Sequence, residues 1–389
     1  MPHRSDRVHI IVDRDIPQAT SAFSRFGDVT LVDGRSVTRA QLLDADILLV
    51  RSVTRVDAQL LEGTNVRLVG TATSGIDHLD TSYLDQRAIA YFDAAGCNAR
   101  AVAEYVLACS FVHGRLAFDG ADALQAGIIG YGHVGKIVCT LLEALGVHCV
   151  VNDPVIADAS SDERFVDIDE ALASDIVTLH VPLTETGDFP TRGLIGRRQL
   201  SRIRPEALLI NTARGAVIDE DALIAWLADG AQTTVAIDCW AGEPAVDLAL
   251  LRLVTIATPH IAGYTSEARL RATTILSRTL AAKIGAVEEW CPYREDMIAL
   301  RTKQKRPTDP GDVLSAAVLE CCDPRLATTA MRQMLGLPQR RRGIIFDQIR
   351  RRAATRHEFG SYCVASADLQ ADTVVRLREI GFETTTIMS

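Results

Sequence analysis

Three ionisable side chains in the middle of the sequence have the chemical types needed to oxidise a hydroxyl group next to a carboxylate. Arg214, Glu243 and His260 each follow a short apolar run that is typical of a buried strand. The oxidation needs a base for the hydroxyl proton, a cation for the carboxylate and the developing carbonyl, and a partner that tunes the base. Each residue alone is more often structural, as a surface ion pair, a helix-entry residue or a buried imidazole. Their positions after successive strands of one predicted sheet favour a shared catalytic role.

A glycine-rich turn upstream of these residues has the spacing of a dinucleotide-binding site. Gly130-x-Gly132-x-x-Gly135 follows an apolar run and opens a helical pattern, and Asp153 lies at the end of the next run. Gly130 permits the tight turn, Gly132 lets the backbone approach a pyrophosphate, and Gly135 allows close helix–strand packing. Asp153 would accept hydrogen bonds from the adenosine ribose. No Arg or Lys follows it at 154–160, so NAD is favoured over NADP.

Alternating apolar runs and helical patterns predict the elements that carry these motifs. Compact apolar runs, typical of strands buried on both faces of a parallel sheet, occupy 8–12, 47–50, 67–70, 89–92, 127–129, 149–151, 176–180, 208–211, 235–238 and 255–257. Helical spacing occupies 98–118, 134–145, 219–229 and 266–287. The repeated units predict α/β domains whose parallel sheets carry helices on both faces. Because 266–287 provides a return path into the first unit, the N-terminal domain would be discontinuous.

The sequence changes in character after Pro292. A polar segment at 301–310, rich in Lys, Arg and Pro, is interpreted as a linker. The remaining residues are interpreted as a separate small module that ends in a strand, a helix and a strand at 361–365, 371–380 and 384–387.

The bulk composition excludes several classes of protein. A chain of 389 residues is long enough for two or three domains, and its 48% hydrophobic and 23% charged residues are ordinary for a soluble globular protein. The net charge of −9 argues against nucleic-acid binding by the chain as a whole. No apolar run reaches membrane-spanning length, and the polar start of the sequence lacks a signal-peptide pattern.

The cysteines indicate a reducing compartment. There are nine of them, an odd number, and no pair has the C-x-x-C spacing of a zinc or redox site. Free and mostly buried thiols are the simplest interpretation. We therefore expect a cytoplasmic protein without a metal site and without membrane or nucleic-acid partners.

Over residues 8–290 these motifs resemble those of the D-2-hydroxyacid dehydrogenases. The likeness includes the glycine-rich turn, the three candidate catalytic segments, and the segments at 75–80 and 98–104. It implies a doubly wound, Rossmann-like NAD-binding domain (106–264) inserted in a flavodoxin-like substrate-binding domain (1–105 with 265–295), with the active site in the cleft. A small α+β dimerisation domain would follow at 296–389.

The resemblance also implies roles for individual residues. His260 would exchange a proton with the C2 hydroxyl, Glu243 would orient its imidazole and raise its pKa, and Arg214 would bind the substrate carboxylate and C2 oxygen. The implied NAD contacts are Gly130, Gly132, Val134, Gly135, Asp153, Val181, Asp238 and Gly263, with Asp238 on the nicotinamide carboxamide. Val181 stands where the family has a hydroxyl residue, so a contact there would use backbone groups.

Within the family, the sequence resembles the branch that acts on 4-phospho-D-erythronate in vitamin B6 biosynthesis. The motifs are Arg51–Arg55, Gly70–Thr73, Gly96–Asn98, His260–Thr265, Phe346–Arg350 and Arg356–Phe359. The resemblance implies oxidation at C2 to (R)-3-hydroxy-2-oxo-4-phosphooxybutanoate, with hydride transfer to NAD in a homodimer. It also implies substrate contacts at four residues, Arg51, Ser52, Thr73 and Tyr264. Ser52 and Thr73 are alternatively turn-capping residues, and Ala353 and His357 depart from the aromatic residue and the Arg that this branch often has.

The ligand of the substrate phosphate stays open between several arginines. Seven arginines lie between Arg340 and Arg356, with Asp347 as the only acid among them. They form either a solvated helix face or a group of which one member, such as Arg350 or Arg356, reaches the partner subunit's active site as a bidentate phosphate ligand. Arg51 and Arg55 are the other candidates.

Two alternative functions stay open. The first is another enzyme of the family, such as 3-phosphoglycerate dehydrogenase, whose substrate differs by one carbon. Its regulated forms would be expected to carry a small-ligand ACT module, which the C-terminal sequence does not resemble. The second is a non-catalytic NAD-sensing corepressor or binding protein built on the same scaffold.

Overall fold

The computed structural model of the chain describes residues 7–114, 116, 123–157, 161–287, 289–293, 297–300, 310–367 and 369–386. Its contacts divide the chain into two compact units, Met1–Asn98 with Glu267–Glu295 and Ala99–Ser266 with Asp296–Ser389. The first unit is discontinuous, because it combines the N-terminal residues with Glu267–Glu295 from the second half of the chain. The second unit is not divided further, so separate NAD-binding and dimerisation domains stay a prediction.

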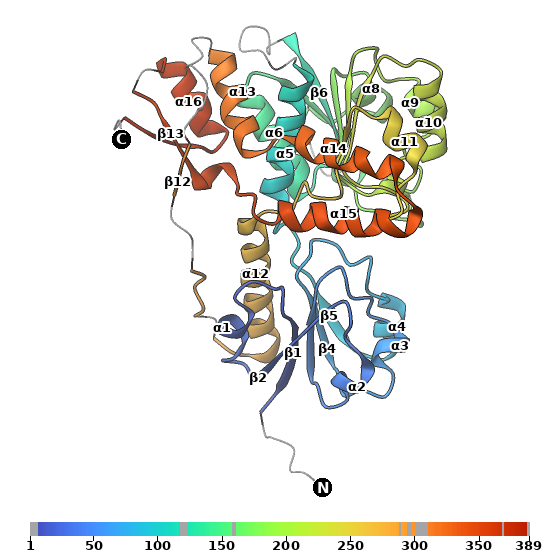
Figure 1. Ribbon diagram of the computed structural model, residues 1–389, viewed down its shortest axis with the longest axis vertical. Coiled ribbons are helices and arrows are strands. Elements are labelled where there is room, and N and C mark those ends of the chain that lie inside the picture. The colour runs from blue at the N-terminus through green and yellow to red at the C-terminus, as the bar shows by residue number, and fades with distance from the viewer. Residues whose placement is uncertain are drawn as a thin grey trace. The chain divides into compact units, whose positions relative to one another are not determined.

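The first unit is a five-stranded parallel sheet in the order β2-β1-β3-β4-β5, the order of a flavodoxin-like fold (Figure 1). The strands are β1 His9–Asp13, β2 Asp28–Val32, β3 Ile47–Val50, β4 Leu68–Thr71 and β5 Ala90–Phe92. The helices are α1 Ala19–Phe23, α2 Arg39–Leu42, α3 Ala58–Leu61, α4 Thr81–Gln86 and α12 Ser266–Ile284. Every residue of β3 and β4 is buried. One face of the sheet packs against α1 and α12, and the other against α2, α3 and α4.

The sequence patterns missed the edge strand β2. Four of its five residues are exposed or only partly buried, because the strand has a neighbour on one side alone. An edge strand of this kind lacks the continuous apolar run that marks a central parallel strand.

The second unit is built on a six-stranded parallel sheet in the order β11-β10-β9-β8-β6-β7. Its strands are β6 Gln125–Ile129, β7 His148–Asn152, β8 Ile176–Leu179, β9 Leu208–Asn211, β10 Thr234–Ile237 and β11 Ile256–Ala257. An isolated parallel bridge between Val151 and Phe165 extends the sheet beyond β7. The strand order reverses between β6 and β8: from β6 the chain first adds β7 on one side, and then β8 to β11 on the other. Ligands of such folds bind at this switch point.

Helices α5 to α11 accompany this sheet. They are α5 Ala99–His113, α6 His133–Glu143, α7 Pro154–Ala157, α8 Ile168–Leu172, α9 Arg197–Leu200, α10 Glu220–Ala228 and α11 Leu248–Leu253. Helix α5 ends earlier than its apolar spacing predicts, because Gly114 takes a left-handed φ of +84° directly after His113. Part of the predicted remainder, up to Phe118, lies outside the described residues.

The C-terminal part of this unit has a second, smaller parallel sheet. Its strands are β12 Ile298–Leu300, β13 Tyr362–Ala365 and β14 Glu383–Thr385, in the order β12-β13-β14, and its helices are α13 Pro310–Cys321, α14 Pro324–Arg332, α15 Gln339–Ala353 and α16 Ala371–Glu379. Residues of α13, among them Leu314 and Val318, share one hydrophobic core with Val102 and Val106 of α5. Residues 301–309 of the predicted linker 301–310 lie outside the described residues, and Pro310 is the first residue of α13. None of the described helices combines the length and the apolar character needed to cross a membrane.

Candidate active site

The loop after β11 carries His260 and is fixed by Asp238 at the end of β10. His260 has a left-handed backbone with φ of 56°, which is uncommon for a residue other than glycine. Its N–H donates to the backbone oxygen of Asp238 at 2.7 Å, and the buried Asp238 carboxylate accepts from the N–H groups of Ile261 at 2.8 Å and Ala262 at 3.0 Å. The hydroxyl of Thr258 also donates to this carboxylate, at 2.6 Å. Asp238 therefore holds the strained loop in place, a role that the sequence did not predict.

His260 and Glu243 form the central pair of the site. Nδ1 of His260 lies 2.9 Å from Oε2 of Glu243, and the other carboxylate oxygen accepts the N–H of Trp240 at 2.9 Å. Burial alone would lower the pKa of His260, but the hydrogen-bonded Glu243 carboxylate raises it well above its usual value. Burial alone would raise the pKa of Glu243, but the adjacent His260 lowers it, so the carboxylate form is favoured. Nδ1 is thus committed to Glu243, which leaves Nε2 as the nitrogen that can exchange a proton.

Cys239 lies beside this pair, and no sequence signal pointed to it. One ligand atom each of Cys239, Glu243 and His260 lies within 4.8 Å of the others. Cys239 is buried, and burial raises the pKa of its thiol, so the neutral thiol is the favoured form near neutral pH.

Arg214 lies on the loop after β9, next to the loop that carries Glu243. A Cβ atom on the following residue, Gly215, would lie 2.0 Å from the carbonyl carbon of Trp240, so the two loops are in backbone contact. The backbone carbonyl of Arg214 accepts a hydrogen bond from the Asn211 side chain at 3.0 Å. The Arg214 side chain donates through Nη1 to the Ala213 carbonyl at 2.8 Å. The structure therefore brings the loops of all three predicted catalytic residues to neighbouring strand ends.

The glycine-rich turn has the geometry that its spacing predicts. Gly130 has φ of +96°, and a Cβ there would lie 2.8–2.9 Å from backbone atoms of His180 and Val181. A Cβ on Gly135 would lie 2.0 Å from the Gly130 carbonyl oxygen, so close packing requires glycine there as well. Nothing lies within 4 Å of a Cβ on Gly132, which is the N-cap residue of α6. The helix N-terminus thus faces open space at the point where a pyrophosphate would be bound.

Asp153 is connected to this turn. One carboxylate oxygen accepts the N–H of Tyr131 at 2.8 Å, and the other accepts the N–H of Ile156 at 3.3 Å. The carboxylate is therefore fixed at the edge of the turn, where the ribose of a dinucleotide bound to α6 would lie. Val134, Val181 and Gly263 are partly exposed. These residues fit NAD, and their individual contacts with it stay a prediction.

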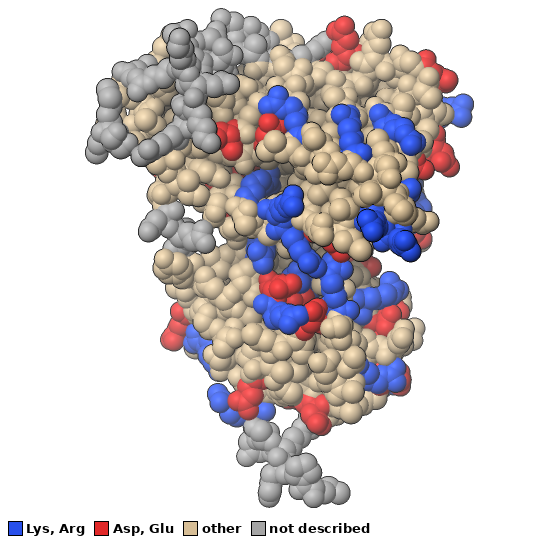
Figure 2. All heavy atoms as spheres, in the orientation of Figure 1, with Lys and Arg blue, Asp and Glu red and all other residues tan. Residues whose placement is uncertain are grey.

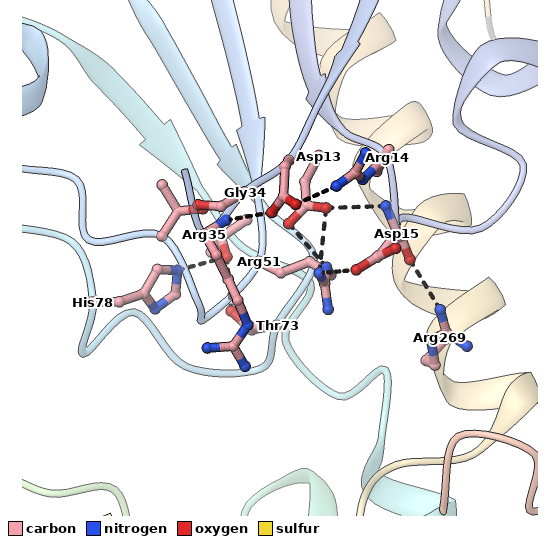
Figure 3. Close-up of polar contacts among 12 residues, drawn as sticks. Asp13, Arg14, Asp15, Gly34, Arg35, Arg51, Thr73, His78 and Arg269 are labelled. Carbon is pink, nitrogen blue, oxygen red and sulfur yellow. Dashed lines mark hydrogen bonds and ion pairs between the residues drawn. The ribbon is translucent and has the colours of Figure 1, made fainter. Parts of the chain in front are cut away.

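The predicted substrate residues of the first unit lie at the ends of β3 and β4. Arg51 is held by two carboxylates (Figure 3): its Nε lies 2.9 Å from Asp13 and its Nη2 lies 2.5 Å from Asp15. A substrate phosphate would have to compete with both acids for this guanidinium. Arg55 is exposed and lies 3.2 Å from Asp57.

The two hydroxyl residues of this group differ in their surroundings. Ser52 is exposed. Thr73 donates to the Gly75 carbonyl at 2.6 Å and lies 2.9 Å from the Thr71 hydroxyl, which also contacts His78 at 2.8 Å. Turn capping by Thr73 is therefore present in the structure, and its hydroxyl would need to rotate to meet a ligand. Tyr264, in the second unit, is partly exposed two residues before α12.

The arginines near the C-terminus separate into two groups. Arg340, Arg341, Arg351 and Arg352 are exposed, and Figure 2 shows Lys and Arg side chains gathered over the region of α15. Arg356 instead points into its own chain, where it donates to the carbonyl of Ala262 and to that of Ala101. The guanidinium of Arg356 is therefore engaged within this chain, and a contact of one of these arginines with a partner's active site stays a prediction.

Comparison with known proteins identifies the family. Residues 108–262 match the family model described as "D-isomer specific 2-hydroxyacid dehydrogenase, NAD binding domain". The erythronate-4-phosphate dehydrogenase of Marinobacter nauticus is 39% identical over 380 residues, which are 96% of this chain and 99% of that protein. The chain belongs to the erythronate-4-phosphate dehydrogenase family. The family member of Hahella chejuensis is 38% identical and is covered to 98% of its length. Family membership makes the chain an NAD-dependent oxidoreductase.

Solved structures support the fold. The NAD+-bound 3-phosphoglycerate dehydrogenase of Entamoeba histolytica matches with a TM-score of 0.61 at 24% identity, over 72% of this chain and 96% of that chain. The D-lactate dehydrogenase of Aquifex aeolicus, in complex with NAD and lactic acid, matches with a TM-score of 0.58 at 23% identity, over 71% of this chain and 95% of that chain. Both leave more than a quarter of this chain unmatched, whereas the erythronate-4-phosphate dehydrogenases cover 96% of it.

Proposed function

We propose that this chain oxidises 4-phospho-D-erythronate at C2 to (R)-3-hydroxy-2-oxo-4-phosphooxybutanoate, coupled to reduction of NAD, in vitamin B6 biosynthesis. The observation that carries the proposal is the full-length similarity to erythronate-4-phosphate dehydrogenases. The similarity covers 96% of this chain, whereas the matched structures of a 3-phosphoglycerate dehydrogenase and a D-lactate dehydrogenase cover 72% and 71% of it. A 3-phosphoglycerate dehydrogenase is the second candidate, and it is supported by likeness of fold alone.

The His260–Glu243 pair supplies the proton chemistry of this reaction. Nε2 of His260 accepts the proton of the C2 hydroxyl, and Glu243, 2.9 Å from Nδ1, orients the imidazole and stabilises its charged form. Arg214 pairs with the substrate carboxylate and stabilises the negative charge on the C2 oxygen as the carbonyl forms. NAD, when bound, accepts the hydride from C2. The products are the 2-oxo acid, NADH and one proton, which leaves through His260.

The remaining predicted residues bind the two ligands. For the cofactor, Asp153 accepts from the adenosine ribose, Gly132 and the N-terminus of α6 face the pyrophosphate, and Asp238 contacts the nicotinamide carboxamide. For the substrate, the proposed contacts of the hydroxyl groups are Ser52, Thr73 and Tyr264, and Arg51 is a further contact.

We also infer that the chain works as a cytoplasmic homodimer formed through its C-terminal residues. Large apolar side chains are exposed there: Leu326 of α14 is 75% exposed and Ile344 of α15 is 58% exposed. Burial of such side chains is the main driving force of protein association. The mostly buried free cysteines support the cytoplasm.

Steady-state turnover tests the proposed function. The purified protein is expected to form NADH continuously from 4-phospho-D-erythronate and NAD, and His260→Gln is expected to lower kcat by a factor on the order of a thousand. Binding of NADH, followed by its fluorescence, should remain in the variant. A protein that binds NAD tightly but turns over no 2-hydroxy acid would instead be a sensor of the cofactor.

A further inference from the structure

The loop that carries His260 is bonded at its far end to a segment close to the C-terminus. We define the His260 loop as residues 260–266 and the C-terminal clamp as residues 354–358. Arg356 donates through Nη2 to the Ala262 carbonyl, and the Arg356 carbonyl accepts the N–H of Ser266 at 2.9 Å. Ser266 also donates through its hydroxyl to the Ala354 carbonyl at 3.4 Å, and Thr265 donates to Glu358 at 3.3 Å. Both ends of the His260 loop are therefore fixed: the first residues by Asp238, and the last residues by the C-terminal clamp.

The C-terminal clamp is itself anchored in the core of the second unit. The N–H of Phe359, the next residue, donates to both carboxylate oxygens of Glu104 on α5, at 3.0 and 3.1 Å. Glu104 also accepts from Arg100 at 2.6 Å. The Phe359 ring is fully buried and stacks on Phe382 with 4.6 Å between the ring centroids. The clamp therefore provides a rigid support for the His260 loop.

Arg356 has an unusual set of partners for a half-buried arginine. Its guanidinium donates to the carbonyls of Ala262 and Ala101 and contacts the Cys322 sulfur at 2.7 Å. Its buried Nε has no hydrogen-bond partner in the described part of the chain. An unsatisfied buried donor costs about 1–3 kcal/mol. The unpaired Nε of Arg356 thus lowers the stability of the fold, but the same side chain places its guanidinium against the backbone of the His260 loop.

We propose that Arg356 is a positioning residue for His260; the role in catalysis rests on the proposed function. The peptide groups on both sides of Ala262 are held, the N–H by Asp238 and the carbonyl by Arg356. A left-handed non-glycine conformation such as that of His260 persists only where its surroundings enforce it. Loss of the Arg356 contact frees one side of the loop, so that the imidazole moves relative to Glu243 and the reacting hydroxyl.

Substitution of Arg356 tests this role. Arg356→Met keeps most of the volume and removes the donors, and Arg356→Lys restores one donor. For 4-phospho-D-erythronate we expect kcat to fall on the order of tenfold to a hundredfold in the Met variant, with a smaller fall in the Lys variant and little change in KM. The matched control is Arg325→Ala, a C-terminal arginine that is exposed and paired with Asp323. Its kcat should remain at the wild-type value.

The His260 pKa, measured by an NMR titration of the imidazole, provides a readout that needs no substrate. Because Glu243 helps to raise this pKa, a displaced loop should lower it toward the ordinary value in Arg356→Met. If that variant does not fold, Thr265→Val removes the hydroxyl that donates to Glu358 and should lower both kcat and the His260 pKa. Folded Arg356 variants with the wild-type kcat and the wild-type His260 pKa would overturn the proposal. A wild-type protein inactive on 4-phospho-D-erythronate, with the pKa shift still present in the variant, would overturn the proposed function instead.

Discussion

At the scale of single residues, the site depends on how Glu243 and His260 shift each other's protonation. The carboxylate lies 2.9 Å from Nδ1 and favours the charged imidazole, so the pKa of His260 is raised despite its burial. Oxidation of an alcohol needs the neutral imidazole as base, and this form exists above the raised pKa. The rate of oxidation should therefore increase with pH, with a midpoint above the ordinary value for histidine.

Glu243→Gln tests this coupling. The substitution removes the negative charge that raises the pKa of His260, so more of the imidazole is neutral at a given pH. The acid limb of the kcat/KM profile should shift to lower pH, while the maximal kcat falls because the imidazole is less firmly oriented and its charged form less stabilised. The measurement is the initial rate of NADH formation across the pH range.

Glu220→Gln is the matched control for this prediction. Glu220 accepts the N–H of Ala241 at 2.7 Å, so it supports the same loop, but it has no hydrogen bond to His260 in the described residues. The acid limb of the kcat/KM profile of Glu220→Gln should stay at the pH of the wild type. An unmoved or upward-shifted limb in Glu243→Gln would contradict the coupling.

The sequence predicted this part of the site because the residue types and their positions after predicted strands together carried the signal. Arg214, Glu243 and His260 follow central strands whose apolar runs are unambiguous, and parallel strands deliver their ends to one edge of the sheet. Cys239 and Arg356 carried no such signal. Cys239 looks like any small buried residue, and the contact of Arg356 with Ala262 joins positions 94 residues apart through a fold that the local pattern does not specify.

At the scale of elements, burial decided which parts of the fold could be predicted. Central strands such as β3, β4, β8 and β9 are buried at every position and were predicted. The edge strands β2 and β12 are partly exposed and were missed. The glycine-rich turn was predicted with its roles because glycine is needed there for geometric reasons, which the contacts of Gly130 and Gly135 satisfy.

A pair of glycine substitutions separates packing from cofactor binding in this turn. In Gly135→Ala the new methyl group would lie 2.0 Å from the Gly130 carbonyl, so α6 must move. We expect a loss of about 1–3 kcal/mol in the free energy of unfolding and weaker NAD binding. In Gly132→Ala the methyl group meets no protein atom within 4 Å, so the melting temperature should change little while NAD binding weakens.

Thermal melting and calorimetric titration with NAD measure the two effects. A Gly135→Ala protein as stable as the wild type would contradict the packing described for α6. A Gly132→Ala protein that binds NAD with unchanged affinity would contradict the position proposed for the pyrophosphate.

At the scale of the whole molecule, the C-terminal residues are more than an appended module. Helix α13 shares a core with α5, and the C-terminal clamp is bonded to the His260 loop. The sequence indicated a separate module because composition changes after Pro292, but composition does not show which surfaces a segment packs against. The same residues also expose the apolar side chains on which the proposed homodimer rests.

A double substitution tests the homodimer. Leu326→Glu combined with Ile344→Glu places two charges on the exposed apolar positions of α14 and α15, where burial against a partner would leave them unpaired. Sedimentation analysis should give a dimer for the wild type and a monomer for the variant. Phe189→Glu is the control, because Phe189 is also exposed, to 49%, but lies between β8 and α9 and not in the C-terminal residues. A wild type that sediments as a monomer would contradict the inference.

The central claim is the identity of the substrate, and the ratio of kcat/KM for two phosphorylated 2-hydroxy acids tests it most directly. Both acids have the hydroxyl and the carboxylate on which Arg214, Glu243 and His260 act. The ratio of kcat/KM therefore depends on the residues that distinguish the two substrates by their length and by the extra hydroxyl. We predict that NADH formation favours 4-phospho-D-erythronate over 3-phosphoglycerate by a factor on the order of a hundred or more. An equal or reversed ratio would contradict the assignment and favour a 3-phosphoglycerate dehydrogenase.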